Sequence, residues 1–530
     1  MPIRPPRVNP RTLREIADLL GVPAPGVPSA GETALGGITH DSRQVQPGDL
    51  YVALSGENTH GARFAAQAVE AGAAAIWTDQ TGAGLAAGIP VPVLVSDQPR
   101  QRLGEVAALI YGEPSDDILM IGVTGTNGKT TTSYLVEAGL RAAGHTTGLI
   151  GTVETLVAGT RIPSVRTTPE ATDVHALLAV MRERGVTACV MEVSSHALAL
   201  GRVDGIVFDV AGFTNLSQDH LDFHRDLEDY FATKASLFTP ARAKSGVVCV
   251  DDAWGRRLAE AATIAVTTID TSGTGDTADW LVSDREVARS GASTAAAVRG
   301  PDGAAFRVVS PLAGGFNVAN AVLAVAMLVT AGVAPQEAIR GIALCPGVPG
   351  RMERVQSTHV AEPLAVVDYA HTPDAVENVL RALRPSTPGR LIVVIGAGGD
   401  RDREKRPQMG AVAAALADIV IVTDDNPRSE DPAAIREAIL DGATGARAEV
   451  REIADRRSAI VAAVSVAVGR ADTVLVAGKG HEQGQEVAGS VLPFDDRVEL
   501  RAALDAWVPP GGGTGDAQAR AGNGGGEPAQ

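Results

Sequence analysis

Residues 120–132, MIGVTGTNGKTTT, place an aliphatic run directly before a glycine-rich loop that ends in Lys-Thr-Thr. Gly125 and Gly128 allow the backbone to curl, so that successive N–H groups can point at one anion. Residues 133–144 have helical spacing, so a helix N-terminus would also face that anion. The stretch therefore predicts a strand, a phosphate-binding loop and a helix.

The polar end of this loop carries the groups that a bound nucleotide requires. Lys129 supplies a positive charge for the outer phosphates, and the hydroxyl of Thr130 or Thr131 can ligate Mg²⁺. The usual motif has a glycine five positions before Gly128, where this chain has Val123. The loop is therefore a shortened variant of the motif, and a glycine-rich turn without a ligand is the less favoured alternative.

The composition is typical of a globular protein with more than one domain. The chain has 530 residues, of which 45% are hydrophobic, and this is longer than one core usually supports. A net charge of −17 argues against nucleic acid or an anionic membrane as the main partner. We expect no membrane span and no signal peptide. Cys189, Cys249 and Cys345 lie far apart, which disfavours a disulfide framework or a zinc site and fits the cytoplasm.

Short β-branched runs alternate with alanine-rich helical stretches, which is the pattern of an α/β fold. Several runs end in chemically reactive polar residues, and ligands bind at that carboxyl edge of open parallel sheets. We expect a smaller N-terminal α/β domain over 11–115, a central domain with a phosphate-loop-type, mostly parallel sheet over 116–349, and a C-terminal domain with a Rossmann-like sheet over 350–508. Segments 1–10 and 509–530 are rich in Pro or Gly and are expected to be disordered.

Candidate metal-binding groups follow two further strands. Glu192 ends a buried run about 60 residues after the loop, and a carboxylate there can hold Mg²⁺ directly or through water. The motif SQDHLDFH at 217–224 contains His220 and can build a metal or general-base site. Helix capping by Asp219 beside surface histidines is the alternative interpretation. Taken alone, Lys234 is an ordinary solvated or ion-paired helical lysine.

Charged residues also follow the later strands of the chain. Arg401 comes just after the glycine-rich turn GAGG, and Arg428 ends the motif DDNPR, where its guanidinium can clamp a carboxylate in bidentate fashion. The motif GKGHE adds the backbone of Gly478 and the carboxylate of Glu482, which can accept an ammonium group. A carboxylate clamp beside an ammonium acceptor suits an amino acid.

Ten motifs occur in one order along about residues 35–500: VTGTNGKTTT, EVSSHAL, FTNLSQDHLDFH, YFATKASLF, FNVANA, PGRME, VDYAHTPD, GGDRDREKRP, DDNPR and AGKGHE. In this order the chain resembles the Mur ligase family, and within it the ligases that add the third residue to the peptidoglycan precursor peptide. The resemblance implies that ATP phosphorylates the D-Glu side chain of UDP-MurNAc-L-Ala-D-Glu. The amine of meso-diaminopimelate then displaces phosphate from the acyl phosphate, with Mg²⁺ as cofactor.

The resemblance also assigns residues to each reactant. Those that resemble the ATP site are Gly125, Thr126, Asn127, Gly128, Lys129, Thr130, Thr131, Asn317, Asn320, Arg351 and Asp368. Those that resemble contacts to the UDP-muramoyl dipeptide are Ser42, Thr167, Thr168, Ser194 and Arg202. Those that resemble the diaminopimelate site are Arg401, Asp425, Asn426, Pro427, Arg428, Gly478 and Glu482.

The resemblance implies a metal environment made by Thr130, Glu192, His220 and Lys234. Lys234 matches the lysine that this family carries as a carbamate. The resemblance therefore replaces the interpretation of Lys234 as an ordinary solvated or ion-paired lysine. With Lys129, the last three of these residues are also the predicted catalytic residues. Leu200 stands where some relatives have Gln, so a substrate contact is not carried over to that position.

The arginine of DNPR is the form found in ligases that accept meso-diaminopimelate, whose distal carboxylate needs a cation. L-lysine and LL-diaminopimelate are the alternative substrates. The DSR motif at 41–43 and the DNPR motif disfavour a folylpolyglutamate synthetase-like ligase. A regulatory ATPase would have no use for an amino-acid site, and a ligase-like protein with an inactive site would not retain every catalytic motif. The expected partners are small molecules.

Overall fold

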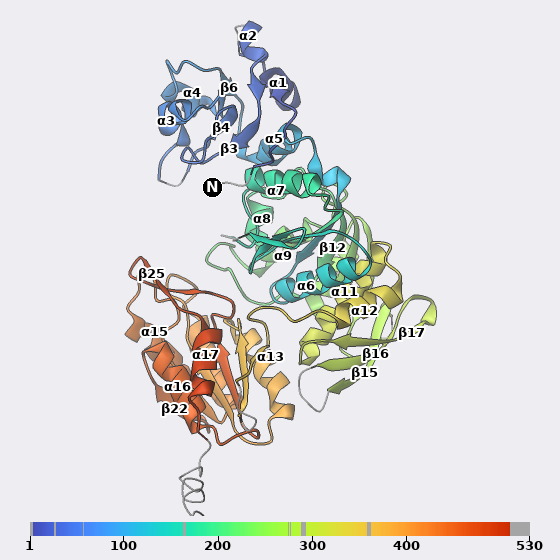
Figure 1. Cartoon of the computed structure of the whole chain (residues 1–530), viewed down its shortest axis with the longest axis vertical. Coiled ribbons are helices and arrows are strands. Elements are labelled where there is room, and N and C mark those ends of the chain that lie inside the picture. The colour runs from blue at the N-terminus through green and yellow to red at the C-terminus, as the bar shows by residue number, and fades with distance from the viewer. Residues whose placement is uncertain are drawn as a thin grey trace, which may run out of the picture. The chain divides into compact units, whose positions relative to one another are not determined.

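The structure is a computed structural model of the chain (Figure 1). It describes residues 4–25, 28–56, 58–162, 166–273, 275, 277–287, 293–357 and 362–508. The chain divides into two compact units, Met1–Val348 and Pro349–Gln530, and each is described by itself. The predicted disordered tail 509–530 lies outside the described residues.

The first unit begins with a small α/β region around a parallel sheet. Over the described residues this sheet has four strands in the order β3-β4-β5-β6, and each neighbouring pair is parallel. Helix α1 begins after Thr12 because the side chains of Thr12 and Glu15 cap each other's backbone N–H groups. Trp77 is fully buried in the core of the region. Arg4, in the segment that was expected to be disordered, pairs with Asp49 at 2.8 Å.

The elements of this region are β1 (Arg11–Thr12), α1 (Leu13–Leu20), α2 (Pro28–Gly31), β2 (Ala34–Leu35), β3 (Gly37–Thr39), β4 (Asp49–Ala53), α3 (Ala65–Glu70), β5 (Ala75–Thr78), α4 (Gln80–Leu85), β6 (Val93–Val95) and α5 (Leu103–Ile110). Short 3₁₀ turns are η1 (Gly61–Phe64), η2 (Pro99–Arg102) and η3 (Pro114–Asp117).

The rest of the first unit is built on a large sheet that is parallel at its centre. Among the described residues its strand order is β10-β9-β8-β11-β7-β12-β13-β14-β15-β16-β17. The pairs from β8 to β15 are parallel, and antiparallel strands extend both edges. Strand β7 lies between β11 and β12, so the segments that follow these three strands meet at one edge of the sheet.

The strands of this sheet are β7 (Leu119–Thr124), β8 (Thr147–Ile150), β9 (Thr155–Val157), β10 (Thr160–Ile162), β11 (Ala188–Glu192), β12 (Phe208–Phe213), β13 (Ala243–Cys249), β14 (Ala265–Asp270), β15 (Trp280–Val287), β16 (Thr294–Arg299) and β17 (Ala305–Ser310). Its helices are α6 (Lys129–Ala142), α7 (Ala171–Glu183), α8 (Ser195–Ala199), α9 (Leu227–Ala235), α10 (Ala253–Ala261), α11 (Gly315–Thr330) and α12 (Pro335–Ala343), with a 3₁₀ turn η4 (Pro301–Gly303).

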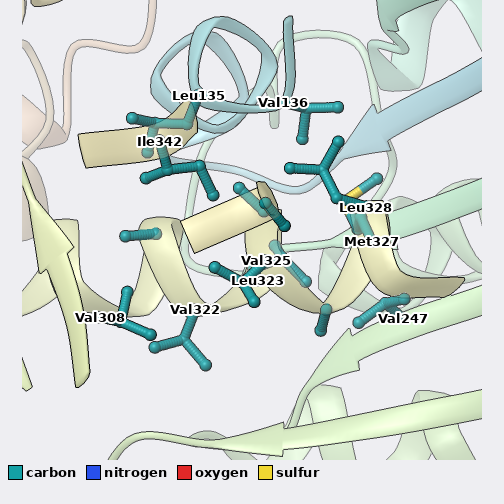
Figure 2. Packing of buried hydrophobic residues seen from close by; sticks show 14 of the residues in the cluster. Leu135, Val136, Val247, Val308, Val322, Leu323, Val325, Met327, Leu328 and Ile342 are labelled. Atoms are coloured by element: carbon teal, nitrogen blue, oxygen red, sulfur yellow. The ribbon is translucent and has the colours of Figure 1, made fainter. Parts of the chain in front are cut away.

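Helix α11 is apolar on nearly all sides and runs through the main core of this part, as Figure 2 shows. Its residues Val322 and Leu328 are buried with Leu135 of α6. A Cβ atom on Gly139 of α6 would lie 2.2 Å from Leu328 Cδ1, so a glycine is needed for this close approach. The packing fixes α11 and α6, which both carry predicted ATP-binding residues, against each other.

The second unit is a Rossmann-like α/β structure. Its described sheet has the order β18-β19-β23-β20-β21-β22, in which only the edge strand β18 is antiparallel to its neighbour. The strands are β18 (Glu353–Val355), β19 (Leu364–Asp368), β20 (Leu391–Ile395), β21 (Ile419–Val422), β22 (Glu449–Glu452) and β23 (Thr473–Ala477), with a separate hairpin β24 (Gly484–Val487) and β25 (Ser490–Pro493). The helices are α13 (Pro373–Leu383), η5 (Arg384–Ser386), α14 (Lys405–Leu416), α15 (Pro432–Ala443), α16 (Arg456–Val466) and α17 (Asp496–Asp505).

All three cysteines are buried and carry free thiols. Burial raises the pKa of the Cys189 thiol to about 12 and also raises the pKa of Cys249 and Cys345. Over the part of the chain that the structure describes, no helix combines the length and apolar character that a membrane crossing requires.

Candidate active site

The phosphate loop joins β7 to α6, as the sequence predicts. Gly125 has φ +140° and Gly128 has φ +87°, a region that favours glycine. A Cβ on Gly125 would lie 1.8 Å from Thr214 Oγ1, and one on Gly128 would lie 2.4 Å from Asn320 Oδ1. Both positions of the loop therefore need glycine for conformation and for space.

Residues that follow β12 hold the loop from one side. Asn127 N–H donates to Asn215 Oδ1 at 3.0 Å, and Thr214 Oγ1 donates to the Asn127 carbonyl at 2.6 Å. Thr126 Oγ1 and Tyr230 Oη lie 3.2 Å apart. Thr214 and Asn215 belong to the quoted motif FTNLSQDHLDFH, but the sequence reasoning did not single them out.

Two lysine side chains converge on the loop. Lys129 Nζ donates to the carbonyls of Gly125 and Thr126 at 2.9 and 2.8 Å, and Lys234 Nζ donates to the same Gly125 carbonyl at 2.7 Å. Lys234 is buried, and its Nζ lies 4.5 Å from the centre of the Tyr230 ring. Burial and the neighbouring Lys129 lower the pKa of Lys234 well below its ordinary value. Lys234 is thus a buried lysine, and its neutral amine forms at a lower pH than that of a solvated lysine.

Glu192 ends β11 beside the loop and is almost completely buried. Its Oε2 accepts from Thr130 Oγ1 at 3.0 Å and from Thr152 Oγ1 at 2.9 Å, and its Oε1 accepts from Thr152 N–H at 2.8 Å. No cationic side chain forms an ion pair with Glu192 among the described residues. A buried carboxylate without a cation is costly, so these oxygen donors fit a hard cation such as Mg²⁺.

The motif at 217–224 forms an aromatic and histidine cluster near Lys234. The His220 ring is 4.9 Å from that of His196 and 6.2 Å from that of Tyr230. His220 Nε2 lies 3.6 Å from Asp219 Oδ2. Partial burial lowers the pKa of His220, and Lys129 contributes to that shift. Within the described residues, no group of three or more His, Cys, Asp or Glu side chains is arranged to hold a metal.

The remaining predicted ATP residues lie in both units. On α11, Asn320 Nδ2 donates to Asn317 Oδ1 at 3.1 Å, and Asn320 Oδ1 packs against Gly128. In the second unit, the Arg351 guanidinium lies 4.3 Å from the centre of the Tyr369 ring. The buried carboxylate of Asp368 accepts two backbone N–H groups, and burial raises its pKa.

Four of the predicted contacts to the muramoyl dipeptide lie close to Glu192 at the end of β11. Thr167 Oγ1 lies 3.0 Å from Thr152 Oγ1, and Thr168 Oγ1 donates to the Glu192 carbonyl at 2.8 Å. Ser194 caps α8 and lies 3.4 Å from Thr168 Oγ1. Arg202 Nη1 donates to the Thr168 carbonyl at 3.4 Å. Ser42 is separate from them, in the loop after β3, and is buried.

Glu170 is a charged residue of this region that the sequence reasoning missed. Its carboxylate pairs with Arg202 at 2.9 Å, with Arg100 at 3.5 Å and with Arg166. These arginines, mainly Arg202, lower the pKa of Glu170 despite its burial. Glu170 stands in the stretch RTTPE, so only its position beside two predicted residues could have drawn attention to it.

In the second unit the predicted amino-acid residues follow β20, β21 and β23. Gly478 N–H donates to the Asp368 carbonyl at 3.1 Å, which places this set beside a predicted ATP residue. Asp425 Oδ2 is 3.9 Å from Arg456 Nη1, and the carbonyl of Pro427 accepts the N–H of Glu430 at 3.0 Å. Arg401 is exposed and donates to the Asp400 carbonyl at 3.2 Å.

Arg428 and Glu482, which the sequence analysis assigns to the charged groups of the substrate, also form ion pairs with other side chains of this unit. Arg428 Nε pairs with Glu486 Oε2 at 3.1 Å, and Glu482 Oε2 pairs with Lys479 Nζ at 3.1 Å. Asn426 bonds to both Lys479 and Glu482. Lys479 lies within the quoted motif GKGHE, yet its role as a partner was not predicted. Glu486 lies on β24, outside every quoted motif.

Comparison with known proteins identifies the fold and the family. Family models match residues 35–111 (Mur ligase family, catalytic domain), 123–328 (Mur ligase middle domain) and 350–480 (Mur ligase, glutamate ligase domain). The chain belongs to the Mur ligase family. The resemblance drawn from the ten motifs and the three-domain α/β fold class are thereby confirmed, and the chain is an enzyme, a ligase.

Two similar Mur ligases are named UDP-N-acetylmuramoyl-L-alanyl-D-glutamate–2,6-diaminopimelate ligase. The Streptomyces coelicolor protein is 56% identical over 508 residues, which cover 95% of this chain and 98% of its own. The Corynebacterium glutamicum protein is 51% identical, over 91% of this chain and 94% of its own.

Solved Mur ligase structures share the architecture. A 2,6-diaminopimelate ligase of the same name is 34% identical with a TM-score of 0.64, covering 94% of this chain and 99% of that one. The MurF ligase of Thermotoga maritima, solved in complex with ADP, is 19% identical with a TM-score of 0.61 over 89% of this chain and 97% of that one, and this likeness shows the fold alone.

Proposed function

We propose that this Mur ligase joins meso-diaminopimelate to the D-Glu side-chain carboxylate of UDP-MurNAc-L-Ala-D-Glu, with ATP as the phosphoryl donor. The observation that carries the proposal is the convergence of Lys129, Lys234 and Glu192 on one phosphate loop, in a chain whose relatives are named for this substrate pair. The reaction belongs to peptidoglycan precursor synthesis and takes place in the cytoplasm.

The residues of the first unit prepare the phosphoryl transfer. Lys129 and the backbone N–H groups of the loop neutralise the developing charge on the γ-phosphate as the D-Glu carboxylate attacks it. Thr130 and Glu192 would hold Mg²⁺, which would supply further positive charge to the phosphates. Lys234, as a carbamate, would offer an anionic oxygen ligand for such a cation together with His220. The products of this step are ADP and an acyl phosphate.

The second unit then supplies the amine. Arg428 binds the distal carboxylate of diaminopimelate and Glu482 accepts an ammonium group, while the reacting amine displaces phosphate from the acyl group to form the amide bond. We accordingly propose that residues 11–115 bind the UDP moiety, that residues 116–349 bind ATP and that residues 350–508 bind the amino acid.

Phosphate release tests the proposal directly. The assay is run with ATP and Mg²⁺, with and without the muramoyl dipeptide, and with meso-diaminopimelate, LL-diaminopimelate or L-lysine in parallel. We expect release that requires the dipeptide and is much faster with meso-diaminopimelate than with LL-diaminopimelate or L-lysine. Release that ignores the amino acid would identify a nucleotide switch, and a preference for lysine would refute the role of Arg428.

A further inference from the structure

A chain of hydrogen bonds in the second unit links four charged residues, three of which bond directly to Asn426. Asn426 Nδ2 donates to Glu482 Oε2 at 2.8 Å, and Lys479 Nζ donates to Asn426 Oδ1 at 2.8 Å and to Glu482 Oε2 at 3.1 Å. Asn426 Oδ1 also accepts the Glu486 N–H at 3.0 Å, and Arg428 Nε donates to Glu486 Oε2 at 3.1 Å. These five residues are called the charge cluster.

The members of the charge cluster differ in depth. The Lys479 side chain is fully buried, whereas those of Arg428, Glu482 and Glu486 are 23%, 30% and 41% exposed. Lys479 therefore lies beneath groups that a ligand can reach. Because a buried ammonium requires acceptors, Lys479 fixes the positions of Asn426 and of one Glu482 oxygen, Oε2. The other oxygen, Oε1, accepts no hydrogen bond from the described residues, which leaves it for a substrate ammonium.

The formal charges of the charge cluster cancel. Lys479 and Arg428 are cations, and Glu482 and Glu486 are anions. The distal end of diaminopimelate carries one ammonium and one carboxylate, which also sum to zero, whereas the distal end of lysine carries only an ammonium. A neutral cluster that presents one cation and one anion is complementary to the distal end of diaminopimelate. A cluster with an extra negative charge would favour the distal ammonium of lysine.

We infer that Lys479 and Glu486 are specificity-determining residues that hold the charge cluster at zero net charge and so favour a diamino acid with a distal carboxylate over L-lysine. The inference rests on the proposed function. In it Lys479 is a positioning residue, since it acts through Glu482 and Asn426. Glu486 acts by balancing Arg428.

Two single substitutions change the net charge of the charge cluster in opposite directions. Lys479→Met makes the cluster negative, and Glu486→Gln makes it positive. Each enzyme is given meso-diaminopimelate and L-lysine together, and the two UDP-muramoyl-tripeptide products are quantified by mass spectrometry, so that their ratio reports the ratio of kcat/KM values. We expect Lys479→Met to shift the product ratio at least about tenfold toward lysine and Glu486→Gln to shift it toward diaminopimelate. Lys479→Arg, which keeps the formal charge, should keep the product ratio within about twofold of the wild-type ratio.

A purely structural role of Lys479 would lower turnover of both amino acids equally. An unchanged product ratio in Lys479→Met would therefore overturn the inference. If Lys479→Met does not fold, Glu486→Gln provides the test, because it changes a partly exposed side chain. A product ratio in Glu486→Gln that is unchanged or shifted toward lysine would overturn the inference. A wild-type enzyme that forms no diaminopimelate product would refute the proposed function itself, a result that is distinct from an active enzyme with unchanged variant ratios.

Discussion

The side-chain nitrogens of Lys129 and Lys234 both bond to one carbonyl oxygen, that of Gly125. Lys129 therefore brings positive charge to the loop where a phosphate is expected to bind. We expect Lys129→Ala to lower turnover by at least about 1,000-fold, because charge that develops on the phosphate loses its main side-chain partner. ADP or phosphate formation measures the effect, and Lys244→Ala, at an exposed lysine paired with Asp209, is the control. An active Lys129→Ala enzyme would contradict the assignment.

Lys234 is predicted to carry a carbamate, so the activity of the enzyme should depend on dissolved carbon dioxide. Its lowered pKa means that the neutral amine, the form that adds CO₂ to give a carbamate, is present at lower pH than in a free lysine. We expect activity to fall when bicarbonate and CO₂ are removed and to return when bicarbonate is added. Lys234→Arg cannot form the carbamate, so it should be inactive at every bicarbonate concentration. Full activity of the wild type in CO₂-free buffer would exclude the modification.

Glu430 is predicted to make stability depend on pH. Hydrogen bonds from Arg406 are the main cause that lowers its pKa to about 2 in the folded state, from an ordinary value of 4.5. Since the folded-state pKa is lowered, ionised Glu430 stabilises the fold fully above about pH 4.5, and this stabilisation is lost as the pH falls toward 2. We expect Glu430→Gln to lower the free energy of unfolding by about 1–3 kcal/mol at pH 6. The difference should shrink below pH 4.5.

Urea unfolding at pH 6, 5, 4 and 3.5 measures this difference. Glu377→Gln is the control, because Glu377 pairs with Arg381 on an exposed helix surface and should contribute much less. A difference between wild type and Glu430→Gln that is constant over this range would contradict the prediction.

At the scale of the element, the turn from β7 into α6 depends on glycine. Gly128→Ala would strain a backbone with φ +87° and push against Asn320. Gly144, just after α6, has φ +91° but open space around its Cβ position, so Gly144→Ala adds the strain without the collision. We expect both variants to lose about 1–2 kcal/mol of stability and only Gly128→Ala to raise the KM for ATP, by at least about tenfold. Equal KM values in the two variants would contradict the prediction.

The same elements show how much the sequence can reveal. The strand-loop-helix at 119–142 was predictable because hydrophobic periodicity and glycines are local signals. Strand β7 lies between β11 and β12, and this order brings Glu192 and Thr214 to the loop. The order depends on pairing between segments that are distant in the sequence, so local signals do not predict it. Motifs likewise identified Glu482 and Arg428 but not their partners Lys479 and Glu486, because a motif does not specify which side chains meet. The roles assigned to these residues remain predictions.

At the scale of the whole molecule, the chain divides into two compact units, Met1–Val348 and Pro349–Gln530. One described core cluster of the second unit is drawn from residues between Val355 and Trp507, and the described clusters of the first unit end at Val348. Compact units with core clusters of their own should unfold in separate steps. We therefore expect two transitions in urea, with midpoints that differ between probes.

Tryptophan fluorescence distinguishes the units. Trp507 is the one tryptophan that the sequence places after residue 348, and Trp77, Trp254 and Trp280 precede it. A fluorescence transition that is present in the wild type and absent from Trp507→Phe reports the second unit, while circular dichroism reports both. A single midpoint shared by all probes would show that the chain unfolds as one cooperative body.

The burial of all three native thiols makes this chain convenient for site-specific labelling. Cys189, Cys249 and Cys345 are buried with raised pKa values, and maleimide dyes react with accessible thiolates. A Val207→Cys, Val498→Cys variant would place one reactive cysteine at an exposed site of each unit without removal of any native residue. Energy transfer between two dyes would then report whether the distance between the labelled sites changes during a single turnover.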